Sequence, residues 1–210
     1  AMSFGAQIID DPSRLAAAIN LGVERGLHDH EFVTWLNDDD LLEPGSLAET
    51  VEFLFSRPGA VAAFGHCRYI DDRGRELWVS RAGAWAPRVL AWGPDLVPQP
   101  GLLIRADGWR AVGGLDPSYS LAFDLDLLLR LKRQGELVST GRIVSNFRWH
   151  PDSLTVDGRE TNIAESERAK RAALGPKARA LAWIWQAPVR MATRVAANEV
   201  NRRASRLAAQ

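Results

Sequence analysis

Three consecutive aspartates, Asp38, Asp39 and Asp40, directly follow Asn37 and are the side chains of this sequence that most clearly suggest chemistry. Adjacent carboxylates repel one another, so such a run is tolerated where a cation lies among them or where water screens them fully. The apolar stretch of residues 31–36 before them predicts a buried strand. Carboxylates at the carboxyl end of a buried parallel strand lie where open α/β sheets bind ligands. A solvated acidic turn is the plainer explanation, but the strand before the run and the helix after it favour a divalent-metal site.

Two further groups of polar residues lie at the ends of predicted elements. Asp124 and Asp126 begin a leucine-rich helix, where the helix terminus stabilises the charged form of a carboxylate. We therefore expect Asp124 to be ionised at neutral pH and able to accept a proton, although a plain N-cap is the commoner use of such an aspartate. Trp149 ends the last predicted strand, and His150 follows it. His150 could contact a metal or a phosphate, whereas a lone histidine is more often structural.

The elements that would position these residues alternate along the chain. Apolar runs predict strands at residues 7–9, 31–36, 61–64, 76–80, 101–104, 137–139 and 143–149. Helical spacing and breaker residues predict helices at residues 12–25, 46–57, 106–112 and 124–134, and a loop with one short helix at 81–100. Alternating strands and helices, followed by an antiparallel hairpin, favour an α/β fold with a mixed sheet flanked by helices.

The helix after the aspartates carries two local predictions. Ser46 with Glu49 three positions later matches a capping box, in which each side chain bonds a backbone N–H at the helix start. Its buried stripe is expected to consist of Leu47, Val51, Leu54 and Phe55.

Composition limits the class of protein. The 210 residues suit one domain with an appendage, and 46% apolar and 25% charged residues are typical of a globular protein. Basic and acidic residues are equal in number, 26 each, so net charge points to no nucleic-acid partner. Cys67 is the single cysteine, which excludes an internal disulfide and suits a cytoplasmic location. No apolar stretch is long enough to span a bilayer, and no signal peptide is visible.

The composition changes after Thr155, and we expect a domain at 1–158 and a basic amphipathic helical extension at 159–210. A polar helix is predicted at residues 160–173, and a second, basic helix from Pro176 onward with a kink at Pro188. Leu181, Ile184, Trp185, Met191 and Val195 lie roughly on one face of the second helix. That face either lies on an anionic membrane surface or packs on the domain or a second copy.

In this order and spacing, these segments together resemble family 2 glycosyltransferases of the GT-A fold. Residues 35–47 resemble the metal-binding segment, and residues 18–22 resemble the helix just before it. Gln99-Pro100-Gly101, residues 113–116 and residues 124–130 resemble the acceptor-side segment, and residues 148–155 the closing motif. The resemblance covers about residues 7–160 and begins near the family's third strand. The family's two strands that bind the nucleotide base would lie between the strands at 7–9 and 31–36 and are expected to be absent here, so that either the chain is a fragment or the sheet is completed differently, for example by another copy of the chain.

The resemblance implies inverting transfer of a sugar from a nucleotide-diphosphate donor to a hydroxyl of a saccharide or lipid-linked acceptor, in cell-surface polysaccharide or glycolipid assembly. Asp39, with Asn37 and Asp40, would bind Mg²⁺ or Mn²⁺ against the diphosphate, and His150 would assist. Asp124 would be the general base. The remaining substrate contacts would come from Asp38, Gln99, Asp126 and Trp149. Many members have aspartate where this chain has Asn37, which lowers the charge available to a metal.

Two other functions are compatible with the sequence. The short start and Asn37 favour a non-catalytic glycosyltransferase-like module that serves oligomerisation or membrane docking, with residues 176–210 contacting the inner face of the membrane. A metal-dependent phosphohydrolase built on the aspartate cluster is weaker, because it needs more metal ligands than His150 can supply.

Overall fold

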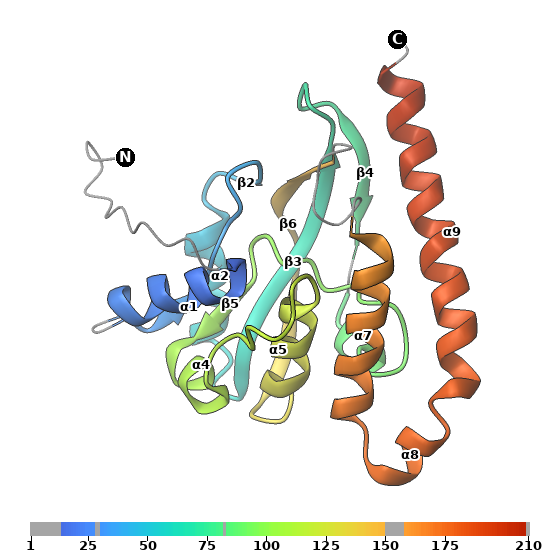
Figure 1. Cartoon of the computed structure of the whole chain (residues 1–210). Coiled ribbons are helices and arrows are strands. Elements are labelled where there is room, and N and C mark those ends of the chain that lie inside the picture. Colours follow the sequence, from blue (N-terminus) through green and yellow to red (C-terminus); the bar gives the residue numbers. More distant parts are fainter. Residues whose placement is uncertain (1–13, 28–29, 82, 150–157, 209–210) are drawn as a thin grey trace.

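The structure, a computed structural model, describes residues 14–27, 30–81, 83–149 and 158–208 (Figure 1). The strand expected at residues 7–9 and the side chain of His150 lie outside the described residues.

The centre of the fold is a six-stranded mixed sheet. Its strands are β1 (Phe32–Val33), β2 (Leu41–Leu42), β3 (Ala60–Ile70), β4 (Glu76–Ser80), β5 (Leu103–Arg105) and β6 (Glu136–Arg148). The order is β1-β5-β3-β6-β2, and β4 pairs with β3. β3 and β6 are parallel, and the other pairs are antiparallel. Because β5 is antiparallel to both β1 and β3, the strands β1, β3 and β6 run in the same direction, and their carboxyl ends lie toward the same end of the sheet.

Helices cover both faces of the sheet (Figure 1). They are α1 (Leu15–Gly26), α2 (Ser46–Phe55), α3 (Ala86–Val89), α4 (Ala106–Val112), α5 (Phe123–Leu131), α7 (Arg159–Ala173), α8 (Pro176–Ala180) and α9 (Trp183–Ala208). The main core joins α1, α4, α5 and α7 to one face of β3 through Ala62 and Phe64. A smaller core under α2 uses Ala63, which points to the other face as successive strand residues do. The mixed α/β architecture is therefore confirmed.

The extension beyond residue 158 shares the main core with the sheet domain. Ala169 of α7 is 1% exposed and belongs to that core, and α7 packs along α5. Helix α9 continues through Pro188 and is the outermost helix on its side of the molecule (Figure 1).

The strand before the aspartates is shorter than predicted. β1 contains only Phe32 and Val33 and pairs antiparallel with β5, so the prediction of a long buried strand over residues 31–36 is wrong in extent. After Val33 the chain leaves the sheet, because Trp35 packs against Trp109 of α4 with ring centroids 6.1 Å apart. The residues that follow are thereby released from strand pairing and form the wall of a cavity.

The predicted capping box is wrong. Gly45, with φ of 76°, precedes α2, and no side chain caps the helix. The Ser46 hydroxyl instead donates to the carbonyl of Val144 on β6 at 2.8 Å, and Glu49 accepts from Arg142 of the same strand at 2.8 Å. Both side chains are therefore used to attach α2 to the sheet.

The buried face of α2 is rotated from the predicted stripe. Ser46, Thr50 and Leu54 are buried, whereas Leu47 and Phe55 are 44% and 52% exposed. The two hydroxyls find backbone acceptors in the buried layer, which allows this partly polar face to pack on the sheet.

The last two predicted strands form one continuous strand, β6, which bulges in the middle. Phe64 pairs with Ser139 while His66 pairs with Ile143, so the three residues 140–142 of β6 lie opposite the single residue Gly65, and β6 has two extra residues. Gly141 has φ of 70°, a conformation that glycine adopts without strain. The predicted hairpin of β3 and β4 and the helix over Ala106–Val112 are confirmed.

Candidate active site

A cavity of about 860 Å³ lies at the carboxyl ends of β1, β3 and β6. Tyr69 of β3 and Phe147 of β6 form its floor, and residues 35–39 after β1 form one wall. The other walls come from the loop of residues 92–100, the start of α5, and the facing sides of α7 and α9. The cavity therefore gathers segments from nearly the whole described chain, including the C-terminal extension.

The aspartate run divides into residues that line the cavity and one that does not. Asn37, Asp38 and Asp39 line it. Asp40 is 3% exposed, and its carboxylate accepts from the backbone N–H of Arg148 at 3.0 Å and from Asn37 Nδ2 at 3.1 Å. Burial, with the nearby charge of Asp39, raises the pKa of Asp40 to about 6. This geometry favours a structural role for Asp40, which fastens the acidic loop to β6.

Arg148 holds the opposite side of the acidic loop. Its Nε donates to the carbonyl of Asp39 at 3.1 Å, and its Nη1 donates to the carbonyls of Asp71 at 2.9 Å and Asp72 at 3.1 Å. One guanidinium thus connects the acidic loop, β6 and the β3–β4 turn.

The oxygen donors on this wall suit a metal that is shared with a substrate. Among the described residues, no group of three or more His, Cys, Asp or Glu side chains could hold a metal ion. Asp39 offers a carboxylate, and Asn37 offers its amide oxygen because its Nδ2 is directed to Asp40. Mg²⁺ commonly takes one or two protein oxygens and completes its shell with substrate phosphates and water. Asn37 and Asp39 therefore fit an ion that completes its coordination shell with substrate oxygens and water, and they are too few for a site made of protein ligands alone.

Asp124 is the second residue of α5, and its side chain lines the cavity. Ala122 is at the N-cap, so Asp124 does not cap the helix, and its Oδ1 accepts from the N–H of Leu125 at 2.8 Å. Burial raises the pKa of Asp124 to about 6, which is opposite to the direction expected from the helix terminus. Loss of hydration therefore outweighs the backbone donors, and makes Asp124 a stronger base than an ordinary aspartate.

Asp95 is a second cavity carboxylate that the sequence analysis missed. Its Oδ1 accepts from the N–H of Val97 at 3.1 Å, and its side chain faces the cavity. Asp95 is exposed to solvent within the cavity, but the surrounding cavity walls and the charge of Asp124 raise its pKa to about 7, while the charge of Lys170 lowers it. Lys170 is 7% exposed and donates to the carbonyl of Gly93 at 2.6 Å. Asp95 and Asp124 therefore titrate as a pair; an aspartate in a proline-rich loop offers no motif that would reveal this.

Glu165 of α7 holds the loop that leads into Asp124. Its carboxylate accepts from the backbone N–H groups of Ser120, Leu121 and Ala122 at 2.8–3.0 Å. Burial alone would raise the pKa of Glu165, but these three donors hold it below its ordinary value. The C-terminal extension thus positions the start of α5.

Asn20 of α1 holds the other loop next to α5. Its Nδ2 donates to the carbonyl of Leu115 at 2.8 Å, and its Oδ1 accepts from the N–H of Leu115 at 2.9 Å. Gly114 has φ of 72°, and a Cβ there would lie 2.7 Å from Asn20 Oδ1. The close approach explains why the chain has glycine at this position.

The other predicted substrate contacts separate into two groups. Gln99 and Trp149 line the cavity, and Gln99 Nε2 donates to the carbonyl of Trp35 at 2.9 Å. Asp126 is 7% exposed and does not line the cavity; its carboxylate pairs with Arg130 at 2.7 Å. Asp126 therefore stabilises α5 in this structure.

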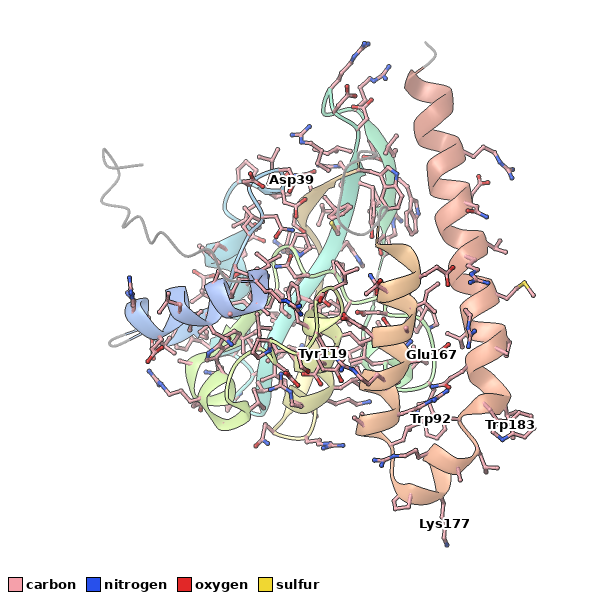
Figure 2. All side chains as sticks on the ribbon, in the orientation of Figure 1. Asp39, Trp92, Tyr119, Glu167, Lys177 and Trp183 are labelled. Atoms are coloured by element: carbon pink, nitrogen blue, oxygen red, sulfur yellow. The ribbon has the colours of Figure 1, made fainter. Side chains whose placement is uncertain are left out.

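Helix α9 closes the cavity with polar side chains. Gln186 is 4% exposed, and its Oε1 accepts from Arg171 Nε and Nη2 at 2.9 and 2.6 Å. Gln186 Nε2 is buried without a hydrogen-bond partner among the described residues. Arg190 pairs with Glu167 at 2.7 Å, and Figure 2 shows Glu167 in the space between α7 and α9. The unpaired amide is a donor available to a bound ligand.

Comparison with known proteins supports the fold and gives no family for this chain. No protein-family model and no curated protein matches this sequence. The structure is similar to that of S. aureus TarS 1-349 in complex with UDP, with a TM-score of 0.53 and 12% identity over 80% of this chain and 47% of that chain. It is also similar to TarS 1-349 without the nucleotide, with a TM-score of 0.50 and 12% identity over 80% of this chain and 51% of that one.

The chain thus spans about half the length of these TarS structures. The similarity shows that this protein has a mixed α/β fold with a curled sheet flanked by helices, like that of TarS.

Proposed function

We propose that this protein is an inverting glycosyltransferase that moves a sugar from a nucleotide-diphosphate donor to a hydroxyl acceptor in cell-surface polysaccharide or glycolipid assembly. The observation that carries the proposal is that Asp39 and Asp124, from distant parts of the chain, line one cavity at the carboxyl ends of the strands. Such a site needs one group for the leaving diphosphate and another for the incoming hydroxyl. The UDP bound to TarS supports a nucleotide as the donor.

The donor diphosphate binds beside Asn37 and Asp39 in this proposal. Mg²⁺ or Mn²⁺ held there, with help from His150, would neutralise charge on the leaving nucleotide diphosphate. Trp149 offers an apolar face to the sugar, while Gln99 and Asp38 offer polar contacts from the same wall. These residues orient the anomeric carbon toward α5.

Asp124 acts as the general base. The acceptor hydroxyl attacks the anomeric carbon from the face opposite the leaving nucleotide diphosphate, its proton passes to an Asp124 carboxylate oxygen, and the configuration inverts. Burial keeps this carboxylate basic enough to take the proton near neutral pH. The acceptor, a saccharide or a lipid-linked saccharide, enters between α5 and α9, where Gln186 Nε2 can donate to one of its hydroxyls.

A non-catalytic glycosyltransferase-like module is the alternative. Asn37 in place of a carboxylate, and the small number of metal ligands in the described part of the chain, favour it. This alternative predicts that the cavity binds no nucleotide.

Calorimetric titration with UDP, GDP, ADP, CDP and dTDP, each with and without Mn²⁺, tests the proposal. We expect one nucleotide to bind in a Mn²⁺-dependent manner, and Asp39→Ala to weaken its binding by about tenfold or more. Asp107→Ala is a control, because Asp107 lies on α4 away from the cavity. The absence of binding by all five nucleotides to folded protein would overturn the glycosyltransferase proposal and leave the non-catalytic module.

A further inference from the structure

Helix α9 is attached to the protein by its polar face. Gln186 accepts from Arg171, Arg190 pairs with Glu167, and Arg194 pairs with Glu160 at 2.7 Å, all toward α7. A surface helix of a globular protein ordinarily turns its apolar face to the core and its charges to water. The orientation of α9 is the reverse, and it leaves an apolar face without a partner in the described structure.

We call the exposed apolar side chains of this segment the outer stripe; they are Leu181, just before α9, Trp183, its first residue, and Ile184, Met191 and Val195. These side chains are between 51% and 69% exposed. Residues 184, 191 and 195, with exposed Pro188 between them, recur at helical spacing, so they share one side of α9. Figure 2 shows Trp183 directed away from the rest of the protein. The side chain of Trp185, which the sequence analysis placed on this face, lies outside the described residues; for the other four predicted side chains, the alternative that they pack on the domain is wrong.

The outer stripe lies in a strongly basic segment. Residues 176–210 contain seven basic side chains and one acidic side chain, Glu199, although the whole chain has a net charge of zero. Glu199 itself lies 3.4 Å from Arg202. Lys177 is exposed just before the stripe, and Figure 2 shows it directed outward at the α8 end of the molecule. The segment that carries the outer stripe thus has a net positive charge, although Arg190 and Arg194 are paired with glutamates on the side toward α7.

Charge decides between the two partners that an apolar helix face can have. Two copies that meet through their α9 helices would bring like charges together, which disfavours association. An anionic lipid surface attracts the same charges, each basic side chain near it contributing about 1 kcal/mol. A tryptophan is well placed at the boundary between headgroups and acyl chains, and arginine can extend its charged end toward the headgroups.

We propose that the outer stripe binds an anionic membrane surface, with α9 lying in the plane of the interface. No helix in the described ranges has the length and apolar character needed to cross a bilayer, so the contact is peripheral. The opposite face of α9 lines the cavity. If the proposed function holds, membrane docking would bring a lipid-linked acceptor next to the cavity; the docking itself does not depend on that function.

Co-sedimentation with lipid vesicles tests the proposal. The probe is a vesicle of phosphatidylcholine with about one third phosphatidylglycerol, compared with phosphatidylcholine alone, at low and high salt. We expect binding to the anionic vesicles that weakens with salt, and a loss of at least tenfold in the double variant Trp183→Ser with Met191→Ser. The matched control, Trp85→Ser with Leu47→Ser, removes two exposed apolar side chains, one of them also a tryptophan, from the residue before α3 and from α2. It should bind as the parent does.

Three outcomes would overturn the proposal. They are absence of vesicle binding by folded parent protein, equal vesicle binding by both double variants, and a concentration-dependent dimer that only the α9 variant abolishes while vesicle binding persists. Light scattering without vesicles detects the dimer, and circular dichroism confirms that each variant is folded. Nucleotide titration of the same α9 variant separates membrane docking from the proposed function. The variant can lose vesicle binding and still bind nucleotide, and the parent can bind vesicles without binding any nucleotide.

Discussion

Glu165 offers a sharp test of whether the C-terminal extension positions the catalytic loop. Glu165→Ala removes the only side-chain acceptor that the structure shows for the N–H groups of Ser120, Leu121 and Ala122. A hydrogen bond to a charged group contributes about 1.5–3 kcal/mol, and water can replace part of that at a half-exposed site. We therefore expect the free energy of unfolding to fall by about 2–3 kcal/mol, which is roughly a 30- to 150-fold change in the folding equilibrium. Glu165→Gln, which keeps one acceptor oxygen, should cost about 1 kcal/mol.

Urea unfolding at neutral pH measures these values, and Glu160→Ala is the matched control on the same helix. Glu160 is 75% exposed in its side chain and makes one ion pair, with Arg194, so its loss should cost less than about 0.5 kcal/mol. The difference between parent and Glu165→Gln should also depend on pH. Because the pKa of Glu165 is lowered on folding, its stabilisation is present above the ordinary glutamate pKa and is lost as the pH falls through the lowered value.

A functional readout separates positioning from simple stability. Glu165→Ala should lower kcat more than it changes nucleotide affinity, since the loop it holds leads to Asp124 rather than to Asp39. If Glu165→Ala and Glu160→Ala lower the free energy of unfolding by the same amount, the proposal that Glu165 of α7 positions residues 120–122 is refuted.

Other predictions concern the two cavity carboxylates and one packing contact. Asp124→Asn should lower the rate of sugar transfer by about 10²-fold or more while nucleotide affinity stays within twofold. The activity of the parent should decline as the pH falls through about 6, where Asp124 becomes protonated. Initial rates of transfer, measured across pH for parent and variant, test both expectations. Folding raises the pKa of Asp95, so the contribution of Asp95 to stability is lost as the pH rises toward about 7. Asp95→Asn should therefore be more stable than the parent at pH 8 but not at pH 4. Urea midpoints of variant and parent that differ by the same amount at pH 4 and pH 8 would contradict this. Gly108→Ala places a Cβ 2.2 Å from Val61 Cγ2 and should cost about 1–3 kcal/mol, whereas Gly22→Ala, with open space around it, should not destabilise the protein in the same thermal assay.

Local patterns predicted the elements whose signals are contained within a few residues. The helix over Ala106–Val112 and the hairpin of β3 and β4 agree with the prediction because spacing and turn residues specify them locally. The prediction failed where a distant segment supplied the partner. Ser46 donates to Val144 on β6 rather than capping its own helix, and no pattern near Ser46 contains that acceptor.

The candidate site likewise contains residues that a local pattern identified and residues whose role depends on distant segments. Residue types alone identified Asp39 and Asp124 as candidates, and both line the cavity. Asp95 and Glu165 had no motif, because their roles depend on the segments that fold against them. The raised pKa of Asp124 could not be foreseen from the sequence, since burial is a property of the assembled cavity.

The sequence by itself determined which residues could do chemistry here, where most helices and strands lie, and that the C-terminal helix is apolar and basic. Periodicity specifies that a helix has an apolar face, but it does not specify what covers that face. Only the tertiary structure decided that Asp40 supports the acidic loop, that α7 clamps the start of α5, and that α9 turns its apolar side outward. The physical reason is that burial, pairing and pKa depend on contacts between segments far apart in the chain, and these contacts exist only after folding.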